Sequence, residues 1–282
     1  MIIVERAGPS ALLQDLGRPG YAHLGVSPSG AADRGALALA NRLVGNPEDG
    51  VAVECLLGGL EVTARDLHWV AVTGAPAEVR VGDRLVGMNA PVPLRPGRRL
   101  RIGRPAAGLR CYLAVRGGIE TPGILGSCST DTLSGLGPSP LRDGEELAIG
   151  VPTRELPAVD LAPVAQTPPE LALLPGPRRD WFSDAAWTTL LGTGWQVTAE
   201  ADRVAIRLGG PRLERRLDDE LPSEAIVRGA VQVPSSGQPL IFGPDHPVTG
   251  GYPVIAVLTR RAGDRAAQLR PGQTVRFTPA RR

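Results

Sequence analysis

Lysine is missing from this sequence of 282 residues, so arginine supplies all 31 of its strongly basic side chains. The absence excludes a Schiff-base lysine, a P-loop lysine and a lysine that carries biotin or lipoyl. Any cationic contact to a carboxylate or a phosphate must then come from arginine, from a backbone nest or from a partner chain.

Cysteine and histidine are also scarce. The three cysteines, Cys55, Cys111 and Cys128, show no paired spacing, so the sequence indicates neither a disulfide framework nor a zinc site. Only three histidines are present, which leaves few ligands for a metal. We therefore expect no structural metal and no covalently bound cofactor.

Excess charge and long apolar runs are lacking too. The net charge is only +2, which does not indicate a nucleic-acid-binding protein. The first residues, MIIVERAG, lack the plan of a signal peptide, and the longest apolar runs are far shorter than a membrane span. These features predict a cytoplasmic protein with no nucleic-acid partner and no membrane partner.

What the sequence does contain is a series of short apolar runs bounded by Gly or Pro, as strands are. These runs span residues 2–7, 51–56, 60–64, 68–74, 77–81 and 109–117. With 36 Gly and 28 Pro to supply turns, they predict a mostly β protein, a sandwich or a barrel, with few helices. Periodicity predicts one helix within 32–46, with Ser29 or Asp33 as its cap, and a second at 183–192.

A Pro-rich segment without periodicity spans residues 151–169. Such composition is typical of a linker. We predict an N-terminal domain over 1–155, a linker over 156–169 and a C-terminal domain over 170–282.

One phrase occurs three times, at 93–103, 140–150 and 269–277. Each copy is a turn with a central Gly that leads into a short alternating strand. Convergent turn chemistry explains the repetition, since Pro-x-Gly turns are common. The other interpretation, which we favour, is that both halves of the chain are versions of one β-barrel that closes on such a strand.

Three polar, glycine-rich stretches hold the candidate chemistry: Leu12 to Asp33, 116–137 and 235–253. Glycines let backbone N–H groups approach a ligand closely, and the N–H groups at a helix start suit an anion or an oxyanion. Arg18 suits a bidentate contact to a carboxylate or a phosphate. Taken alone, each stretch is also consistent with a surface loop held by an Arg–Asp pair, serine caps and β-turns.

The ordinary catalytic motifs are missing. The sequence contains no P-loop, no G-x-S-x-G elbow and no H-E-x-x-H. Cys128 has no histidine or other base nearby in the sequence, so we do not expect it to be a nucleophile. A self-contained ATPase, serine hydrolase or zinc hydrolase is therefore not expected.

Together the stretches carry a resemblance that covers the whole chain. The motifs are QDLGRPGYAHLGVSPSGAAD with ANRLVGN and a VEC strand, then YLAVRGGIETPGILGSCSTDTLSGLG, then GAVQVPSSGQPLIFGPDHPVTGGYPVIAVL and AAQLRPGQTVRF. In this order they resemble the biotin-dependent carboxyltransferase-like family. Its members include the C subunit of bacterial 5-oxoprolinase, KipA and the second subunit of allophanate-hydrolase-type proteins. Two positions depart from the family pattern: Ala32 replaces a common Met, and Asp202 replaces a common Asn, which puts ligand contact by residue 202 in doubt.

The resemblance implies two cyclophilin-like β-barrel domains with a few short helices. It also implies ATP-dependent ring opening of 5-oxoproline to L-glutamate, with ATP as a co-substrate. A KipI-like B subunit would act with the C subunit on 5-oxoproline and ATP, and a LamB/YcsF-like A subunit would complete the hydrolysis. Such a chain is expected to be inactive alone.

On this hypothesis a lactam is the small-molecule substrate, and side chains in the three stretches divide the work. Asp15, Asp33 or His246 takes the lactam proton. The residues expected to bind or orient the substrate are Gln14, Arg18, Tyr21, Ser29, Ser127, Thr130, Gln232, Gln238, Thr249 and Tyr252. Two alternatives stay open: biotin-dependent carboxyl transfer to a urea-like amide, with a separate biotin carrier, and a KipA-like role as antagonist of a kinase inhibitor.

Overall fold

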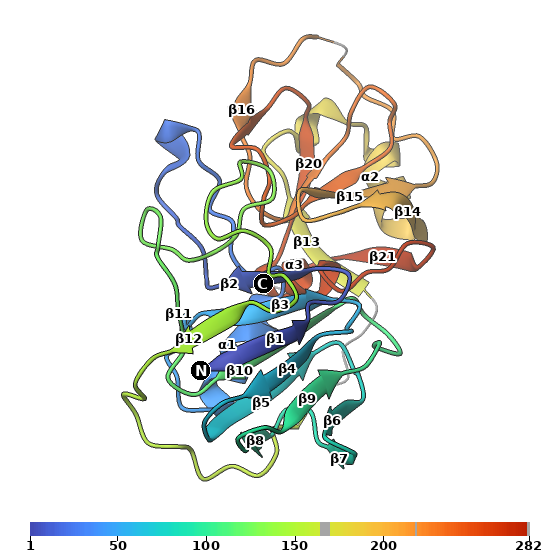
Figure 1. Ribbon diagram of the computed structural model, residues 1–282. Coiled ribbons are helices and arrows are strands. Elements are labelled where there is room, and N and C mark those ends of the chain that lie inside the picture. The colour runs from blue at the N-terminus through green and yellow to red at the C-terminus, as the bar shows by residue number, and fades with distance from the viewer. Residues whose placement is uncertain (164–169, 218, 281–282) are drawn as a thin grey trace. The chain divides into compact units, whose positions relative to one another are not determined.

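The structure is a computed structural model that describes residues 1–163, 170–217 and 219–280 (Figure 1). Strands dominate the described chain, and its three α-helices are short. The predicted mostly β class with few short helices is therefore confirmed.

The described chain separates into two compact units. The first unit contains residues 1–18, 29–131 and 135–163, and the second contains 19–28, 132–134 and the described residues from 170 onward. The domain boundaries drawn from the sequence stay a prediction. Residues 164–169 of the predicted linker lie outside the described residues.

The strands of the first unit form two sheets. The seven-stranded sheet has the order β11-β12-β1-β4-β9-β6-β7, and the five-stranded sheet has the order β2-β3-β10-β5-β8. The bounds are β1 Ile2–Arg6, β2 Ala11–Gln14, β3 Ala52–Leu56, β4 Glu61–Ala64, β5 His68–Gly74, β6 Val79–Val81, β7 Arg84–Val86, β8 Pro91–Leu94, β9 Arg99–Ile102, β10 Arg110–Val115, β11 Ile119–Glu120 and β12 Glu146–Ile149. All six predicted runs in this part of the chain thus contain strands.

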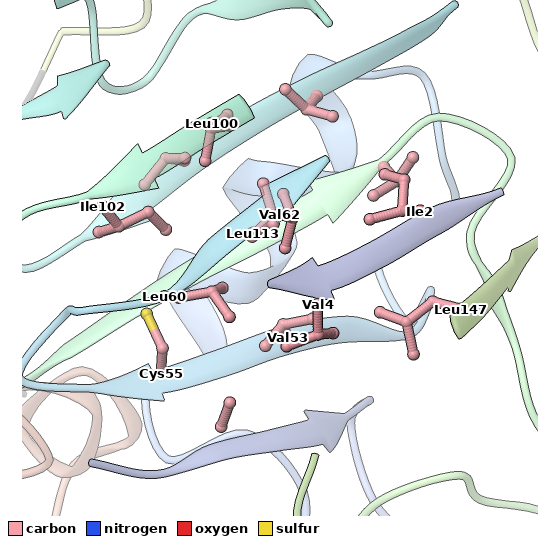
Figure 2. Packing of buried hydrophobic residues seen from close by; sticks show 14 of the residues in the cluster. Ile2, Val4, Val53, Cys55, Leu60, Val62, Leu100, Ile102, Leu113 and Leu147 are labelled. Atoms are coloured by element: carbon pink, nitrogen blue, oxygen red, sulfur yellow. The ribbon is translucent and has the colours of Figure 1, made fainter. Parts of the chain in front are cut away.

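The core of the first unit is aliphatic (Figure 2). Alternate residues of a strand point to the same face, so Ile2 and Val4 of β1 are both fully buried. Val53 and Cys55 of β3 repeat this spacing and lie in the same cluster. Each buried aliphatic side chain of this size contributes about 1.5–3 kcal/mol relative to exposure.

Helix α1, Arg34–Leu43, packs on the five-stranded sheet (Figure 1). The Asp33 carboxylate caps it by accepting a hydrogen bond from Ala36 N at 2.9 Å. Its buried face includes Leu37 and Ala40, which cluster with small residues of β5 and β10. The predicted helix and one of its two predicted caps are confirmed.

The second unit is built on a closed barrel with the order β13-β20-β17-β18-β15-β14-β21. Parallel pairing of β13 with β21 closes the ring, and β16 pairs with β19 in a separate two-stranded sheet. The bounds are β13 Glu170–Pro175, β14 Trp195–Ala201, β15 Ala205–Gly209, β16 Glu224–Ala225, β17 Ala230–Gln232, β18 Leu240–Phe242, β19 Thr249–Gly250, β20 Val254–Leu258 and β21 Thr274–Pro279.

Two α-helices belong to the second unit. Helix α2, Asp184–Gly192, has Ser183 as its N-cap and confirms the helix predicted at 183–192. Helix α3, Arg260–Ala266, was not predicted from the sequence. Short 3₁₀ turns occur at Ala22–Leu24 (η1) and Arg179–Trp181 (η2).

The three copies of the repeated phrase adopt the predicted local form. Gly97, Gly144 and Gly272 have φ values of 70°, 84° and 83°, in the left-handed region that favours glycine. They precede β9, β12 and β21 respectively. β21 belongs to the ring that closes the barrel of the second unit, whereas β9 and β12 lie in the seven-stranded sheet of the first unit.

Candidate functional site

The stretch from Leu12 to Asp33 connects β2 to α1 through a loop that closes on itself. Ala31 N donates a hydrogen bond to Asp15 O at 2.9 Å. At Gly30, where φ is +92°, a Cβ atom would lie 2.7 Å from the backbone carbon of Leu16. Only glycine permits this approach, so the glycine content brings the two ends of the loop together.

Asp15 is the centre of a dense hydrogen-bond cluster in the first unit. Its Oδ1 accepts hydrogen bonds from Gly17 N at 2.7 Å, from Ser127 Oγ at 2.7 Å and from Ser129 Oγ. Its Oδ2 accepts a hydrogen bond from Cys128 N at 2.7 Å. A carboxylate has about four lone-pair sites, and these four donors, three on Oδ1 and one on Oδ2, use most of them. This geometry suits an anchor for the 127–129 turn better than a base that takes a proton.

Arg18 lies beside the same turn and is only 1% exposed. Its Nε donates to Ile124 O at 3.3 Å and its Nη2 donates to Ser129 O. Its Nη1 is buried and has no hydrogen-bond partner. Two of its three nitrogens therefore bind backbone carbonyls in this structure, and the bidentate contact expected from the sequence stays a prediction. We call Asp15, Arg18 and residues 127–129 the Asp15 cluster.

Gln14 and Ser29 bind the next residue of the same segment. Gln14 Nε2 donates to Thr130 O at 2.8 Å, and Ser29 Oγ donates to that carbonyl at 3.2 Å. Gln14 Oε1 is buried and has no hydrogen-bond partner. Thr130 Oγ1 donates to Pro138 O. Two predicted stretches, 12–33 and 116–137, are therefore brought together within the first unit.

The Cys128 thiol belongs to a residue of the Asp15 cluster and is half-buried. Burial raises its pKa, the nearby Asp15 carboxylate raises it further, and Arg18 opposes them. Its Sγ donates to Thr121 O at 3.3 Å. A thiol with a raised pKa is a poor nucleophile at neutral pH, in line with the expectation from the sequence.

Asp33 belongs to a second buried network of the first unit. Its backbone N–H donates to the Tyr112 hydroxyl at 2.7 Å, and that hydroxyl donates to Glu54 Oε2 at 2.7 Å. Arg110 forms an ion pair with Glu54 at 3.3 Å. Burial raises the pKa of Tyr112 well above its usual range, and the neighbouring Glu54 and Asp33 charges add to the shift. The network fixes the end of the loop where α1 begins.

The second unit has its own buried acid, Asp245. Arg203 binds it bidentately, with Nε to Oδ2 at 2.8 Å and Nη2 to Oδ1 at 3.0 Å. Thr132 donates to Oδ2 from its N–H at 2.9 Å and from its Oγ1 at 2.7 Å. Ser27 Oγ donates to Pro244 O at 3.1 Å. These bonds tie residues 27 and 132 to the barrel loop that carries Asp245.

His246 follows that aspartate and is buried against Phe242, with ring centroids 6.3 Å apart. Its Nδ1 lies 2.8 Å from Pro247 O. A carbonyl oxygen only accepts, so Nδ1 carries the proton and Nε2 is the basic nitrogen of the neutral ring. This tautomer is the one that a base acting through Nε2 requires.

The remaining candidates of the second unit are dispersed. Gln232 Nε2 donates to Tyr252 O at 2.9 Å, and the exposed Tyr252 ring lies 5.6 Å from the Arg215 guanidinium. Gln238 instead exchanges two hydrogen bonds with the backbone of Gly210, both at 2.9 Å. Thr249 is exposed on β19, and Tyr21 is half-buried in the loop before η1. Of these candidates, Gln232 and Tyr252 are the pair that the structure brings together.

Three residues that hydrogen-bond to the buried carboxylates were not among the predicted site residues. Ser129, Arg203 and Thr132 each bind a buried carboxylate from a distant part of the sequence. Asp202, the residue that departs from the family pattern, accepts from Val204 N and Ala205 N, both at 2.8 Å. An Asn side chain offers the same acceptor oxygen, so the departure leaves this turn intact.

In the described ranges, no group of three or more His, Cys, Asp or Glu side chains is arranged to hold a metal ion. Within the same ranges, no helix has both the length and the apolar character that a membrane crossing requires.

Comparison with known proteins identifies the family. The carboxyltransferase domain, subdomain A and B, family matches residues 24–279. The C subunit of 5-oxoprolinase from Escherichia coli (strain K12) is 39% identical over 282 residues, covering 98% of this chain and 90% of that protein. Urea amidolyase of Lachancea kluyveri is 31% identical over 98% of this chain, which spans only 17% of that protein. The crystal structure of the K. lactis urea amidolyase superposes with a TM-score of 0.91 at 28% identity, over 99% of this chain and 18% of that one. The chain therefore belongs to the family of carboxyltransferase domains with subdomains A and B.

Proposed function

We propose that this chain is the C subunit of an ATP-dependent 5-oxoprolinase. In this proposal it acts with a KipI-like B subunit to activate 5-oxoproline at the expense of ATP. A LamB/YcsF-like A subunit then completes ring opening to L-glutamate. The chain alone is expected to have no activity.

The observation that carries the proposal is the extent of the match to the C subunit of 5-oxoprolinase. The E. coli protein matches over 98% of this chain and 90% of its own length. The Lachancea kluyveri urea amidolyase matches over a similar share of this chain but is far longer, since the match covers 17% of it. The match thus spans most of the first relative and a small part of the second.

The chemistry of 5-oxoproline sets the tasks of the site. Its lactam carbonyl is a poor electrophile, and phosphorylation of the carbonyl oxygen makes attack by water feasible. The site must therefore hold the amide, accept its N–H proton and stabilise negative charge on its oxygen. Arg18 and Gln14 each have a buried polar atom without a partner, which supports a role in holding the amide. We assign Asp15 to positioning, because its carboxylate already accepts four hydrogen bonds.

Co-expression with the KipI-like and LamB/YcsF-like partners tests the proposal. We expect the complex of three proteins to hydrolyse ATP only when 5-oxoproline is present and to release glutamate in proportion. Omission of this chain should abolish both signals. A stable complex that shows neither signal contradicts the proposal.

A second candidate is carboxyl transfer from biotin to a urea-like amide, favoured by the TM-score of 0.91 to the K. lactis urea amidolyase. Because the chain has no lysine, biotin would have to come on a separate carrier protein. Incubation with a carboxylated biotin carrier and urea separates the two reactions. Carboxyl transfer without 5-oxoproline-dependent ATP hydrolysis would favour this candidate.

A further inference from the structure

We infer that Arg18 binds a single carbonyl oxygen of a cyclic amide, and that neither the carboxylate of the substrate nor a phosphate of ATP binds there. This inference rests on the proposed function and specifies which part of the substrate meets which side chain. It replaces the bidentate anion contact expected from the sequence.

The first argument is the number of nitrogens that Arg18 has available. Carboxylates and phosphates are recognised by arginine through two parallel N–H···O bonds from two nitrogens. In this structure Nε and Nη2 already donate to Ile124 O and Ser129 O. Nη1 is the nitrogen of this guanidinium that has no acceptor. Nη1 keeps both of its N–H groups unused, and a single carbonyl oxygen can accept from it.

The second argument is charge. The Asp15 carboxylate and Arg18 share the 127–129 turn, and both act on the pKa of Cys128 in opposite directions. An incoming carboxylate or phosphate would therefore meet the negative charge of Asp15 as well as the positive charge of Arg18. A neutral amide carbonyl meets no such repulsion. As its oxygen gains negative charge during activation, its attraction to Arg18 increases.

The third argument is the energetic cost of leaving the buried Nη1 of Arg18 without an acceptor. A buried N–H group without an acceptor loses its hydration and gains nothing in return. The two acceptors that Arg18 already has are both amide carbonyl oxygens of the backbone. A lactam carbonyl is also an amide carbonyl, so it gives Arg18 a third acceptor of the same kind. Because Nη1 is covered in this structure, binding requires a local opening.

The test compares two ligands on the complex with the KipI-like and LamB/YcsF-like partners. 5-Oxoproline carries both the lactam and a carboxylate, whereas 2-pyrrolidinone carries the same lactam without the carboxylate. Affinities are measured by calorimetry for the wild type, Arg18→Met and Arg18→Lys. Arg98→Met is the matched control, because Arg98 is an exposed arginine of the same unit. Thermal melting confirms that each variant is folded.

We expect Arg18→Met to lower the affinity of the complex for both ligands by the same factor, about ten- to hundredfold. The affinities of Arg18→Lys should lie between those of Arg18→Met and the wild type, and those of the control should equal the wild type. Weakening of 5-oxoproline alone would place the carboxylate on Arg18 and overturn the inference. So would a rise only in the KM for ATP, or a wild type that binds 5-oxoproline but not 2-pyrrolidinone. A wild-type complex without 5-oxoproline-dependent ATP hydrolysis contradicts the proposed function itself, which is a different outcome from any of these.

Discussion

Arg18 in the first unit and Arg203 in the second are both almost completely buried, at 1% and 6% exposure, yet they are held in opposite ways. Arg203 meets Asp245 through two hydrogen bonds, and its charge is matched by that carboxylate. Arg18 meets two backbone carbonyls and keeps one nitrogen without an acceptor. The acid nearest to it in the sequence, Asp15, uses its oxygens to accept from serine and backbone donors.

The difference separates a structural arginine from a candidate functional one. A buried ion pair with good geometry holds two segments together and has nothing left for a ligand. A buried guanidinium with an unused N–H group costs stability, and such a cost is typical of sites prepared for a substrate. The following substitutions test this distinction, beginning with the largest expected effect.

Arg203→Met should be the most damaging substitution. It leaves the buried Asp245 carboxylate without its cation, and breaking one side of a buried pair costs about 3–5 kcal/mol. Denaturant unfolding measures the loss. Arg207→Met is the matched control, since Arg207 pairs with Glu200 in an exposed position. Equal losses of unfolding free energy in the two variants would contradict the structural role that we give to Arg203.

Asp15→Asn should destabilise the first unit by about 1–3 kcal/mol, because an amide NH₂ would then face donors that need an acceptor. The same change should loosen the 127–129 turn. Cys128 reports on this turn, since Cys55 and Cys111 are buried. Faster alkylation of Cys128 in the variant than in the wild type is the expected result. An unchanged rate would show that the turn holds without the Asp15 carboxylate.

Arg18→Met should lose less stability than Arg203→Met, because the substitution removes an incompletely satisfied charge along with its two hydrogen bonds. Activity of the complex should instead fall about a hundredfold, as for loss of a well-placed oxyanion donor. Arg203→Met should thus lose more stability than Arg18→Met, whereas Arg18→Met should lose more turnover than Arg203→Met. A larger stability loss at Arg18 than at Arg203 would break the comparison.

Arg178→Met should have the smallest effect, since the Arg178–Glu224 pair is partly exposed. The hydrogen bond from Arg178 lowers the pKa of Glu224. Stability from this pair is therefore present above the ordinary Glu pKa of about 4.3 and is lost as the pH falls through the lowered value. The difference in unfolding free energy between wild type and variant should be smaller at pH 3 than at pH 7. An equal difference at the two pH values would point to packing instead.

Local features of the fold could be predicted from the sequence because they depend on neighbouring residues. The strand at 68–74 and the Asp33 cap of α1 follow from alternation and from capping chemistry within a few positions. Helix α3 was missed because Arg260–Ala266 is short, contains a glycine and lacks an apolar stripe long enough to recognise.

The candidate site was predictable only as a set of residues. Gln14, Asp15 and Arg18 stood out by their chemistry, but three of the four donors to the Asp15 carboxylate come from positions 112 to 114 residues away. Arg203 lies 42 residues from Asp245, and no local pattern joins them. The sequence therefore could not show that Asp15 accepts four hydrogen bonds or that Arg18 keeps one nitrogen without an acceptor. Those properties arise from pairing across the fold.

The closed barrel has a consequence for how this protein is handled. A ring of strands presents no unpaired backbone edge to another molecule, whereas an open sheet presents two. The seven-stranded sheet ends at β7, where Leu85 is 58% exposed beside the charged Arg84. Aggregation during expression or refolding should therefore begin at the first unit, and a proline or a second charge placed on β7 is the first remedy to try.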